Sequence, residues 1–336
     1  MALLSEIVDS LGGMAQKQQL VRRGAHDRDL TYAVRTGDVV RVRNGWYSTM
    51  GEHSPGLRAV RVGGRLTGIS AIIAQGGWVL GGHPLHVAVN GNAARLRTQN
   101  NRHRRLNLQA HAGVVVHWSS REQAARGTAI SVGLLDALER VVLDEEFEVA
   151  VAALDWALHT AQIDTIDLET LTLRLPVERR GIREWVDSAC ESLPESLART
   201  RFRLAGYRVV SQVPLGDSQR IDLVVEDEIG VEVDGREHHL ERFEYDRSKD
   251  VDITLDHKQA MRPSANMIFH DWDRFQSAVA AALSDRGVVF ENSGPSRRDP
   301  LHAPALRGFR RRPPRRSPEF STGGRGWRGS RWGRRE

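Results

Sequence analysis

The chain has 336 residues, of which 40% are hydrophobic and 27% charged, values that are ordinary for a globular protein with room for two or three domains. Its single cysteine, Cys190, excludes an intramolecular disulfide and a zinc site built from several thiolates. No apolar run is long enough to cross a bilayer, and the first residues lack the basic start and long apolar core of a signal peptide. We therefore expect a soluble, cytoplasmic protein without a membrane partner.

The net charge of +5 conceals an uneven distribution along the chain. Segments 56–130 and 287–336 are strongly basic, whereas segments 131–190 and 191–286 are acidic. Charge divided in this way favours a polyanionic partner that is bound by particular faces rather than by the whole surface.

Residues 1–52 are predicted to form three short helices followed by a two-stranded hairpin. Met14 and Val21 are expected in the core, and Asp27 is expected to cap the third helix. Asn44-Gly45 separates two alternating strands and is a strong hairpin signal. This order predicts a winged helix-turn-helix, although a small helical cap that binds no ligand would have a similar sequence pattern. The candidate nucleic-acid-binding residues are the arginines expected to be exposed on the third helix and the wing: Arg28, Arg35, Arg41 and Arg43.

The stretch "GGMAQKQQLVRRGAHDRDLTYAVRTGDVVRVRNGWYS", residues 12–48, resembles the N-terminal winged-helix domain of the AbiEi-type antitoxins. The resemblance implies a DNA-binding element of the kind used for autoregulation in toxin-antitoxin systems. Whether a cognate toxin or a second copy of the chain is a partner is left open by the sequence. The segment carries almost no net charge, which favours weak DNA binding by this unit alone.

Residues 53–188 are predicted to form an α/β middle region with a basic first half and an acidic, helical second half. Strand-like runs occur at 76–82, 85–91 and 112–120, and two amphipathic helices are expected within 128–164. A basic run between the strands is either a solvated loop or a set of phosphate contacts. Its arginines are Arg95, Arg97, Arg102, Arg104 and Arg105.

The stretch "RIDLVVEDEIGVEVDGREHH" gathers acids and imidazoles on one predicted hairpin. If the chain turns at Glu226–Glu228, Val225 pairs with Ile229 and Asp222 lies directly opposite Glu232. Like charges at opposed positions destabilise a sheet unless a cation lies between them. Carboxylate ligands favour magnesium or manganese over zinc, so the pattern predicts a Mg²⁺ or Mn²⁺ site.

Two simpler interpretations of the same stretch stay open. The register also places Arg220 opposite Asp234, so an ion pair could account for Asp234. The whole cluster could instead be an acidic hairpin that faces solvent.

The segment from "ESLARTRFRLAGYRVV" through the hairpin to "FEYDRSKD" resembles the very-short-patch-repair-like endonucleases, a branch of the PD-(D/E)xK restriction-endonuclease-like fold. The resemblance covers about residues 190–275 and implies a mixed sheet flanked by helices, a metal at its open edge and phosphodiester hydrolysis. It implies that Asp222 and Glu232 bind the metal, with the carbonyl of Val233. The other implied catalytic residues are Glu195 on the leading helix and Asp234 or His239 to position or deprotonate the water, with His238 a weaker candidate.

Two features depart from the family pattern. Position 234 is an aspartate where many members of the superfamily have a lysine, and Arg247 or Lys249 is expected to supply that charge. The stretch "LDHKQAMR", residues 255–262, offers no clear strand before Pro263, which puts the last strand of the fold in doubt.

The sequence as a whole predicts an α+β multidomain protein with units at 1–52, 53–188 and 189–286 and a disordered arginine-rich tail at 287–336. The favoured function is a DNA-binding, Mg²⁺-dependent endonuclease. The alternative is an antitoxin-like transcriptional regulator whose nuclease-fold domain is catalytically inactive. A nuclease that acts on RNA stays open as well.

Overall fold

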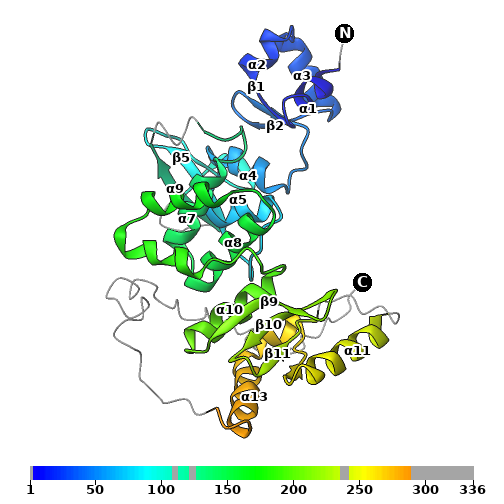
Figure 1. The fold of residues 1–336 in the computed structure, drawn as a ribbon. Helices are drawn as coiled ribbons and strands as arrows, with labels where there is room; N and C mark the ends of the chain where they lie inside the picture. Colours follow the sequence, from blue (N-terminus) through cyan, green and yellow to red (C-terminus); the bar gives the residue numbers. More distant parts are fainter. Residues whose placement is uncertain (1–2, 108–112, 121–125, 235–241, 289–336) are drawn as a thin grey trace, which may run out of the picture.

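The computed structural model describes residues 3–107, 113–120, 126–234 and 242–288, with the backbone alone for 242–246. Within these residues the chain is a mixed α+β protein with four small sheets. Figure 1 shows the elements gathered into three bodies that follow one another from the N-terminal end. No helix in this part of the chain is both long enough and apolar enough to cross a membrane. The predicted disordered tail lies outside the described residues from 289 onward.

The first body packs three helices on a three-stranded antiparallel sheet with the order β1-β3-β2. Its core consists of apolar side chains from all three helices, among them Val8, Leu20 and Leu30. Its elements are α1 (Leu4–Asp9), β1 (Met14–Gln16), α2 (Lys17–Arg22), α3 (Asp27–Thr36), β2 (Val40–Arg43) and β3 (Trp46–Ser48).

The sequence prediction for this body is right in its helices and hairpin and wrong in three details. Met14 is buried as expected, but it lies in a third strand that pairs with β3 rather than at the start of the second predicted helix. Val21 is 49% exposed, since α2 is too short to bury a second face. The N-cap of α3 is His26, and Asp27 is the first helical residue.

The second body is built on the parallel pair β5–β8, with β4 antiparallel to β5. Helix α8 is buried on nearly all sides rather than amphipathic, because other helices and the third body enclose it. The predicted strand at 76–82 is wrong, since these residues form a turn and irregular chain. The elements are α4 (Pro55–Val62), β4 (Arg65–Leu66), α5 (Gly68–Ala74), β5 (Leu85–Asn90), β6 (Arg97–Thr98), β7 (Asn101–Arg105), β8 (Val114–Ser119), α7 (Leu134–Asp144), α8 (Phe147–His159), α9 (Thr165–Arg174) and η1 (Val177–Trp185).

The third body is a four-stranded mixed sheet with the order β12-β11-β10-β9 and helices packed against it. Strands β9, β10 and β11 are antiparallel, and β12 runs parallel to β11. The elements are α10 (Leu193–Leu204), β9 (Val209–Leu215), β10 (Gln219–Val225), β11 (Ile229–Val231), α11 (Arg242–Leu255), β12 (Gln259–Met261), α12 (Ala265–His270) and α13 (Trp272–Asp285).

The register of the hairpin agrees with its prediction, since Val225 pairs with Ile229. The turn places Glu226 and Asp227 at φ values of 53° and 61°, in the left-handed region that hairpin turns require. The strand that was in doubt exists as β12, which is only three residues long and ends before Pro263.

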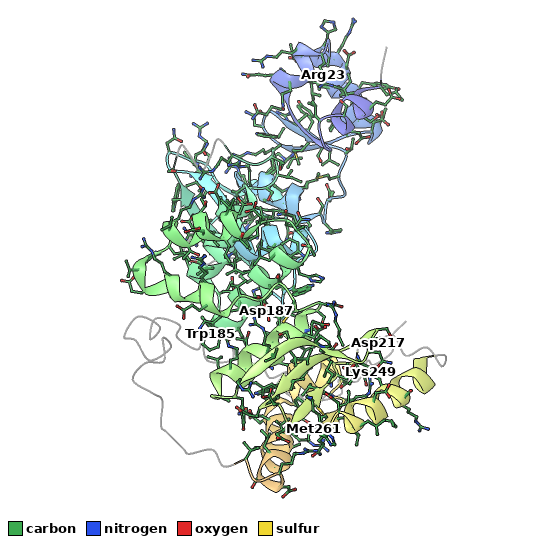
Figure 2. All side chains as sticks on the ribbon, in the orientation of Figure 1. Arg23, Trp185, Asp187, Asp217, Lys249 and Met261 are labelled. Carbon is green, nitrogen blue, oxygen red and sulfur yellow. The ribbon has the colours of Figure 1, made fainter. Side chains whose placement is uncertain are left out.

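The second and third bodies are joined by a buried ionic network. Asp155 of α8 accepts hydrogen bonds from Ser196 Oγ at 2.5 Å and Arg199 Nη2 at 2.8 Å, both from α10. Its other oxygen accepts from the Asp187 N–H at 2.7 Å. Figure 2 shows Trp185 and Asp187 where these two bodies meet. The network therefore fixes the orientation of α10, which carries Glu195.

Replacing Asp155 by alanine is expected to lower the free energy of unfolding by about 3–5 kcal/mol, because Arg199 is left buried without its counter-ion. Chemical denaturation of the two proteins measures the difference. Asp187→Ala is the matched control, since Asp187 is partly exposed and 4.0 Å from Arg199 Nε, and it should cost at most about 1 kcal/mol. Equal losses in the two variants would contradict the assignment.

Candidate functional site

The two acids of the predicted hairpin lie next to each other in the third body. Asp222 lies within β10, and Glu232 follows the last residue of β11. The Asp222 N–H donates to Glu232 Oε1 at 3.3 Å, and the Val233 N–H donates to Asp222 Oδ2 at 2.8 Å. These bonds hold the two carboxylates beside one another, as their opposed positions predict.

A lysine from the next helix joins this pair. The ammonium of Lys249, in α11, forms an ion pair with Glu232 Oε2, and only 13% of the lysine and 6% of the glutamate side chain are exposed. Figure 2 shows Lys249 on the third body. Sequence spacing leaves open whether Arg247 or Lys249 reaches the acids, and the structure gives this contact to Lys249.

The carboxylates of this group carry raised pKa values. Burial, and then the negative charge of Asp222, raise the pKa of Glu232 to about 7 even though Lys249 opposes the shift. Burial also raises the pKa of Asp222. Burial and the charge of Asp222 raise the pKa of Glu195. Burial is the largest cause of all three shifts, so these carboxylates hold their protons more tightly than exposed ones do.

The raised pKa of Glu232 makes stability depend on pH. The folded protein binds the proton of Glu232 more tightly than the unfolded chain does. Protonation of Glu232 therefore stabilises the fold fully below about pH 4.5, and this stabilisation is lost as the pH rises to about 7. In EDTA, the wild type should therefore lose about 1–3 kcal/mol relative to Glu232→Gln across this range. Urea denaturation of both proteins at several pH values measures this difference, and a constant difference would contradict it.

Glu195 lies in the first turn of α10 and is held by local hydrogen bonds. Its carboxylate accepts from Ser192 Oγ at 2.6 Å, from the Glu191 N–H at 3.0 Å and from Gln212 Nε2 at 3.2 Å. Gln212 lies in β9 beside Asp222 of β10, and its φ of 53° is unusual within a strand. A non-glycine residue in this conformation costs about 1–3 kcal/mol and is commonest at functional sites.

Asp234 is held by an arginine that the sequence analysis missed. Arg262 Nη1 lies 3.3 Å from Asp234 Oδ1, and its Nε donates to Asp250 Oδ1 at 2.6 Å. The alternative explanation of Asp234, an ion pair with Arg220, is wrong, because Asp234 has left the β10–β11 pairing and bridges to Ser264 instead. Arg262 directly follows β12, so its position near Asp234 could be predicted only once that strand is known, and the sequence left the strand in doubt.

One face of α3 carries the two exposed arginines predicted for it. Arg28 and Arg35 are exposed and lie on the same side as Tyr32, which is 68% exposed, because the three residues are spaced at four and three positions. A large aromatic ring between two arginines on a solvent-facing helix is a surface suited to phosphates and bases. Tyr32 was missed because its spacing alone is also compatible with a core position.

The wing lies against the basic run of the second body. Arg102 Nη1 donates to the Arg41 carbonyl at 2.6 Å, so β2 and the β6–β7 hairpin adjoin. Arg41 is exposed as expected, but Arg43 is half-buried and donates to the Val60 carbonyl at 3.5 Å. Arg43 is therefore wrongly predicted as exposed, since docking of the wing on α4 turns its guanidinium inward.

A cavity of about 350 Å³ lies between the wing and the basic hairpin. Arg61 on its wall is buried, and its Nε has no hydrogen-bond partner among the described residues. Burial lowers the pKa of Arg61. The cavity is lined by Val34, Gly37, Val39, Val40, Arg41, Glu52, Arg61, Asn100, Asn101 and Arg102.

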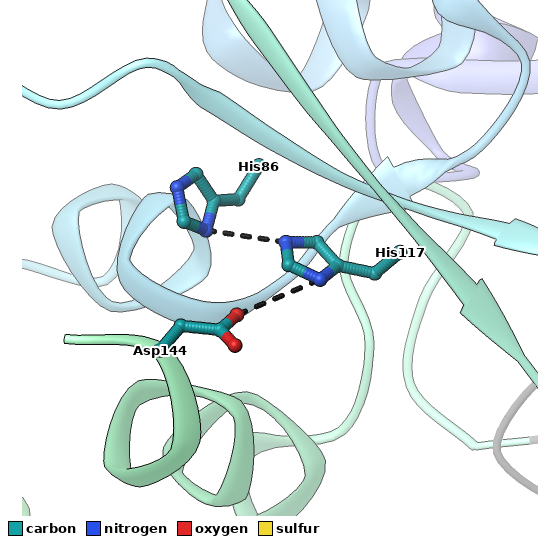
Figure 3. Close-up of side chains that lie close together, drawn as sticks. All are labelled: His86, His117 and Asp144. Carbon is teal, nitrogen blue, oxygen red and sulfur yellow. Dashed lines mark hydrogen bonds and ion pairs between the residues drawn. The ribbon is translucent and has the colours of Figure 1, made fainter. Parts of the chain in front are cut away.

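A separate group of ligand-type side chains lies in the second body, far along the chain from the acid hairpin. His86, His117 and Asp144 each offer one ligand atom, and these atoms lie within 4.8 Å of one another. Among the described residues, the acids of the hairpin form no such group of three. Figure 3 shows His117 between His86 and Asp144. Burial, and then Arg140, lower the pKa of His117 to about 4.

Of the predicted catalytic residues, Asp222 and Glu232 lie together and Glu195 is near enough for Asp222 to shift its pKa. His238 and His239 lie within 235–241, outside the described residues. Comparison of the chain with family models and with curated proteins finds no match. The site is therefore interpreted from its own chemistry.

Proposed function

We propose that the chain is a magnesium-dependent endonuclease that binds DNA and hydrolyses its phosphodiester bonds. The observation that carries this proposal is the pair of acids Asp222 and Glu232 on the central hairpin of a mixed sheet, with Lys249 of α11 bound to Glu232. A sheet of this kind, flanked by helices, is also what the resemblance to the very-short-patch-repair-like endonucleases implies. The group places a lysine beside the two acids that the resemblance implies as metal ligands.

The donor set at this site fits Mg²⁺. Asp222 and Glu232 supply hard carboxylate oxygens, and Mg²⁺ typically takes one or two carboxylates and keeps several waters. Burial raises the pKa of both acids, and the charge of Asp222 adds to the shift at Glu232, so a bound divalent cation would favour their ionised forms. When bound, the ion would polarise the scissile phosphate and lower the pKa of a water molecule.

The residues around the metal ligands then have separate roles. Lys249 would stabilise the negative charge that develops on the phosphate oxygens in the transition state. Asp234, held by Arg262, would orient the attacking water, with His239 the other candidate for this role. Glu195 and the strained Gln212 would position Asp222 from the neighbouring helix and strand.

The first body would bring the nuclease to DNA. Three helices followed by a hairpin wing is the order of a winged helix-turn-helix, and α3 would enter the major groove. Arg28, Tyr32 and Arg35 face solvent on α3, and Arg41 with the β6–β7 hairpin extends the basic surface. Joining the basic hairpin to the wing offsets the low net charge of the first body.

Removing both Arg28 and Arg35 is expected to weaken DNA binding and to lower the salt dependence of binding by about one unit for each phosphate that the variant no longer neutralises. Fluorescence anisotropy with duplex DNA at several salt concentrations measures this slope. Arg274→Ala is the matched control, since Arg274 is equally exposed but lies on α13 of the third body. An unchanged slope in the double variant would show that α3 does not contact DNA.

The test of the proposed activity is cleavage of supercoiled plasmid by the full chain in Mg²⁺, in Mn²⁺ and in EDTA, with single-stranded DNA and RNA as further substrates. Nicking or linearisation that requires the divalent ion supports the proposal. Cleavage of RNA without cleavage of DNA would identify RNA as the substrate. A chain that binds no Mg²⁺ and cuts no substrate would refute the enzyme and favour the alternative, an antitoxin-like regulator, which binding to its own promoter would then test.

A further inference from the structure

The second body brings two histidines and an aspartate from three separate elements to one point. His86 comes from β5, His117 from the neighbouring strand β8, and Asp144 is the last residue of α7. His86 Nδ1 is 3.3 Å from His117 Nε2, and His117 Nδ1 is 3.5 Å from Asp144 Oδ2. The two imidazoles are almost wholly buried, and Figure 3 shows all three side chains directed toward one another.

We propose that His86, His117 and Asp144 bind a divalent transition-metal ion such as Zn²⁺ at a site distinct from the acid hairpin. Zinc is bound by histidine nitrogen at about 2.0–2.1 Å, so two ligands of a tetrahedral site are about 3.3–3.4 Å apart. One ligand atom from each of the three residues lies within 4.8 Å of the others. His117 directs Nε2 to His86 and Nδ1 to Asp144, so a rotation of its ring would bring one nitrogen and the other two ligands to that spacing. Two imidazoles and one carboxylate form a ligand set that suits zinc and leaves a coordination position for water.

A second carboxylate, that of Glu145, lies near the other nitrogen of His86. Glu145 Oε1 lies 4.0 Å from His86 Nε2, on the opposite side of the ring from the nitrogen that faces His117. Glu145 Oε2 lies 3.5 Å from His83 Nδ1. Metal-binding histidines usually direct their second nitrogen to a carboxylate in this way, which orients the ring and fixes its tautomer.

The end of a helix and a glycine adjoin the three residues. Asp144 is at the C-terminal end of α7, where the helix dipole favours positive charge. Gly68 adopts a φ of 51°, and a Cβ there would lie 3.3 Å from His86 Nδ1. Arg140 is the opposing charge, but it approaches Asp144 Oδ1 at 3.4 Å while Oδ2 faces His117.

A chain of hydrogen bonds between the same side chains is the competing explanation, because 3.3 Å also suits an N–H donor facing an imidazole nitrogen. The two explanations differ in whether the chain takes up metal. The test is isothermal titration of the full chain with Zn²⁺ after treatment with EDTA, with Co²⁺ absorption as a report of tetrahedral coordination.

The wild type is expected to bind one Zn²⁺ at this site, and His117→Gln and Asp144→Asn to bind it at least about 100-fold more weakly. Glu145→Gln keeps all three ligands and should weaken Zn²⁺ binding about 10-fold to 100-fold. This variant tests the site even if a variant of one of the ligands does not fold. His159→Gln, which removes an exposed histidine at the end of α8, should bind Zn²⁺ as the wild type does. A wild type without zinc affinity, or zinc affinity unchanged in both Asp144→Asn and Glu145→Gln, would overturn the proposal.

Discussion

Replacing Asp222 by asparagine or Glu232 by glutamine is expected to lower the rate of Mg²⁺-dependent DNA cleavage by about 10³-fold or more. Each change keeps the size of the side chain and the hydrogen bond that joins the two residues, but removes one negative charge. Loss of a metal ligand removes several kcal/mol of transition-state stabilisation, and each 1.36 kcal/mol corresponds to a tenfold change in rate. Single-turnover cleavage of plasmid DNA gives the rate.

The same variants separate the nuclease proposal from the regulator alternative. DNA affinity should stay within a few-fold of the wild type, because the proposed DNA-binding arginines lie in the first body. Asp217→Asn is the matched control, since Asp217 is an exposed aspartate in the turn between β9 and β10. Wild-type cleavage by both hairpin variants would mean that the nuclease activity lies elsewhere in the chain.

Local sequence pattern is enough to predict the hairpin of the candidate site. Apolar residues alternate on both sides of Glu226–Glu228, and only one register buries all of them, so the pairing of Val225 with Ile229 and the proximity of Asp222 to Glu232 follow. The helix that carries Glu195 is similarly local, because Ser192 caps it and Pro194 occupies its first turn.

Features that depend on contacts between distant segments could not be predicted in this way. β12 is three residues long and is a strand only because β11 pairs with it. Arg43 alternates with buried valines as an exposed residue would, yet packing of the wing on α4 turns it inward. His86, His117 and Asp144 have no spacing typical of a metal motif, since adjacent parallel strands and a helix end bring them together.

Lys249 is expected to act in the chemical step. Lys249→Met should lower the cleavage rate by about 10²–10³-fold, the usual effect of removing one group that stabilises charge in a transition state. Lys249→Arg keeps the charge and should retain more activity than the methionine variant. The affinity for Mg²⁺, measured by titration calorimetry, should be equal to or above that of the wild type, because Lys249 competes with the ion for Glu232.

This combination distinguishes a catalytic lysine from a structural one. If Lys249 only neutralised Glu232 before the metal binds, its loss would leave cleavage unchanged at saturating Mg²⁺, because the ion would supply the missing charge. Lys258→Met is the matched control, since Lys258 follows the same helix and is also paired with an acid, Asp256. A rate loss in Lys249→Met that saturating Mg²⁺ does not restore, with Lys258→Met unaffected, assigns the lysine to the transition state. It would then take the role of the lysine that position 234 lacks.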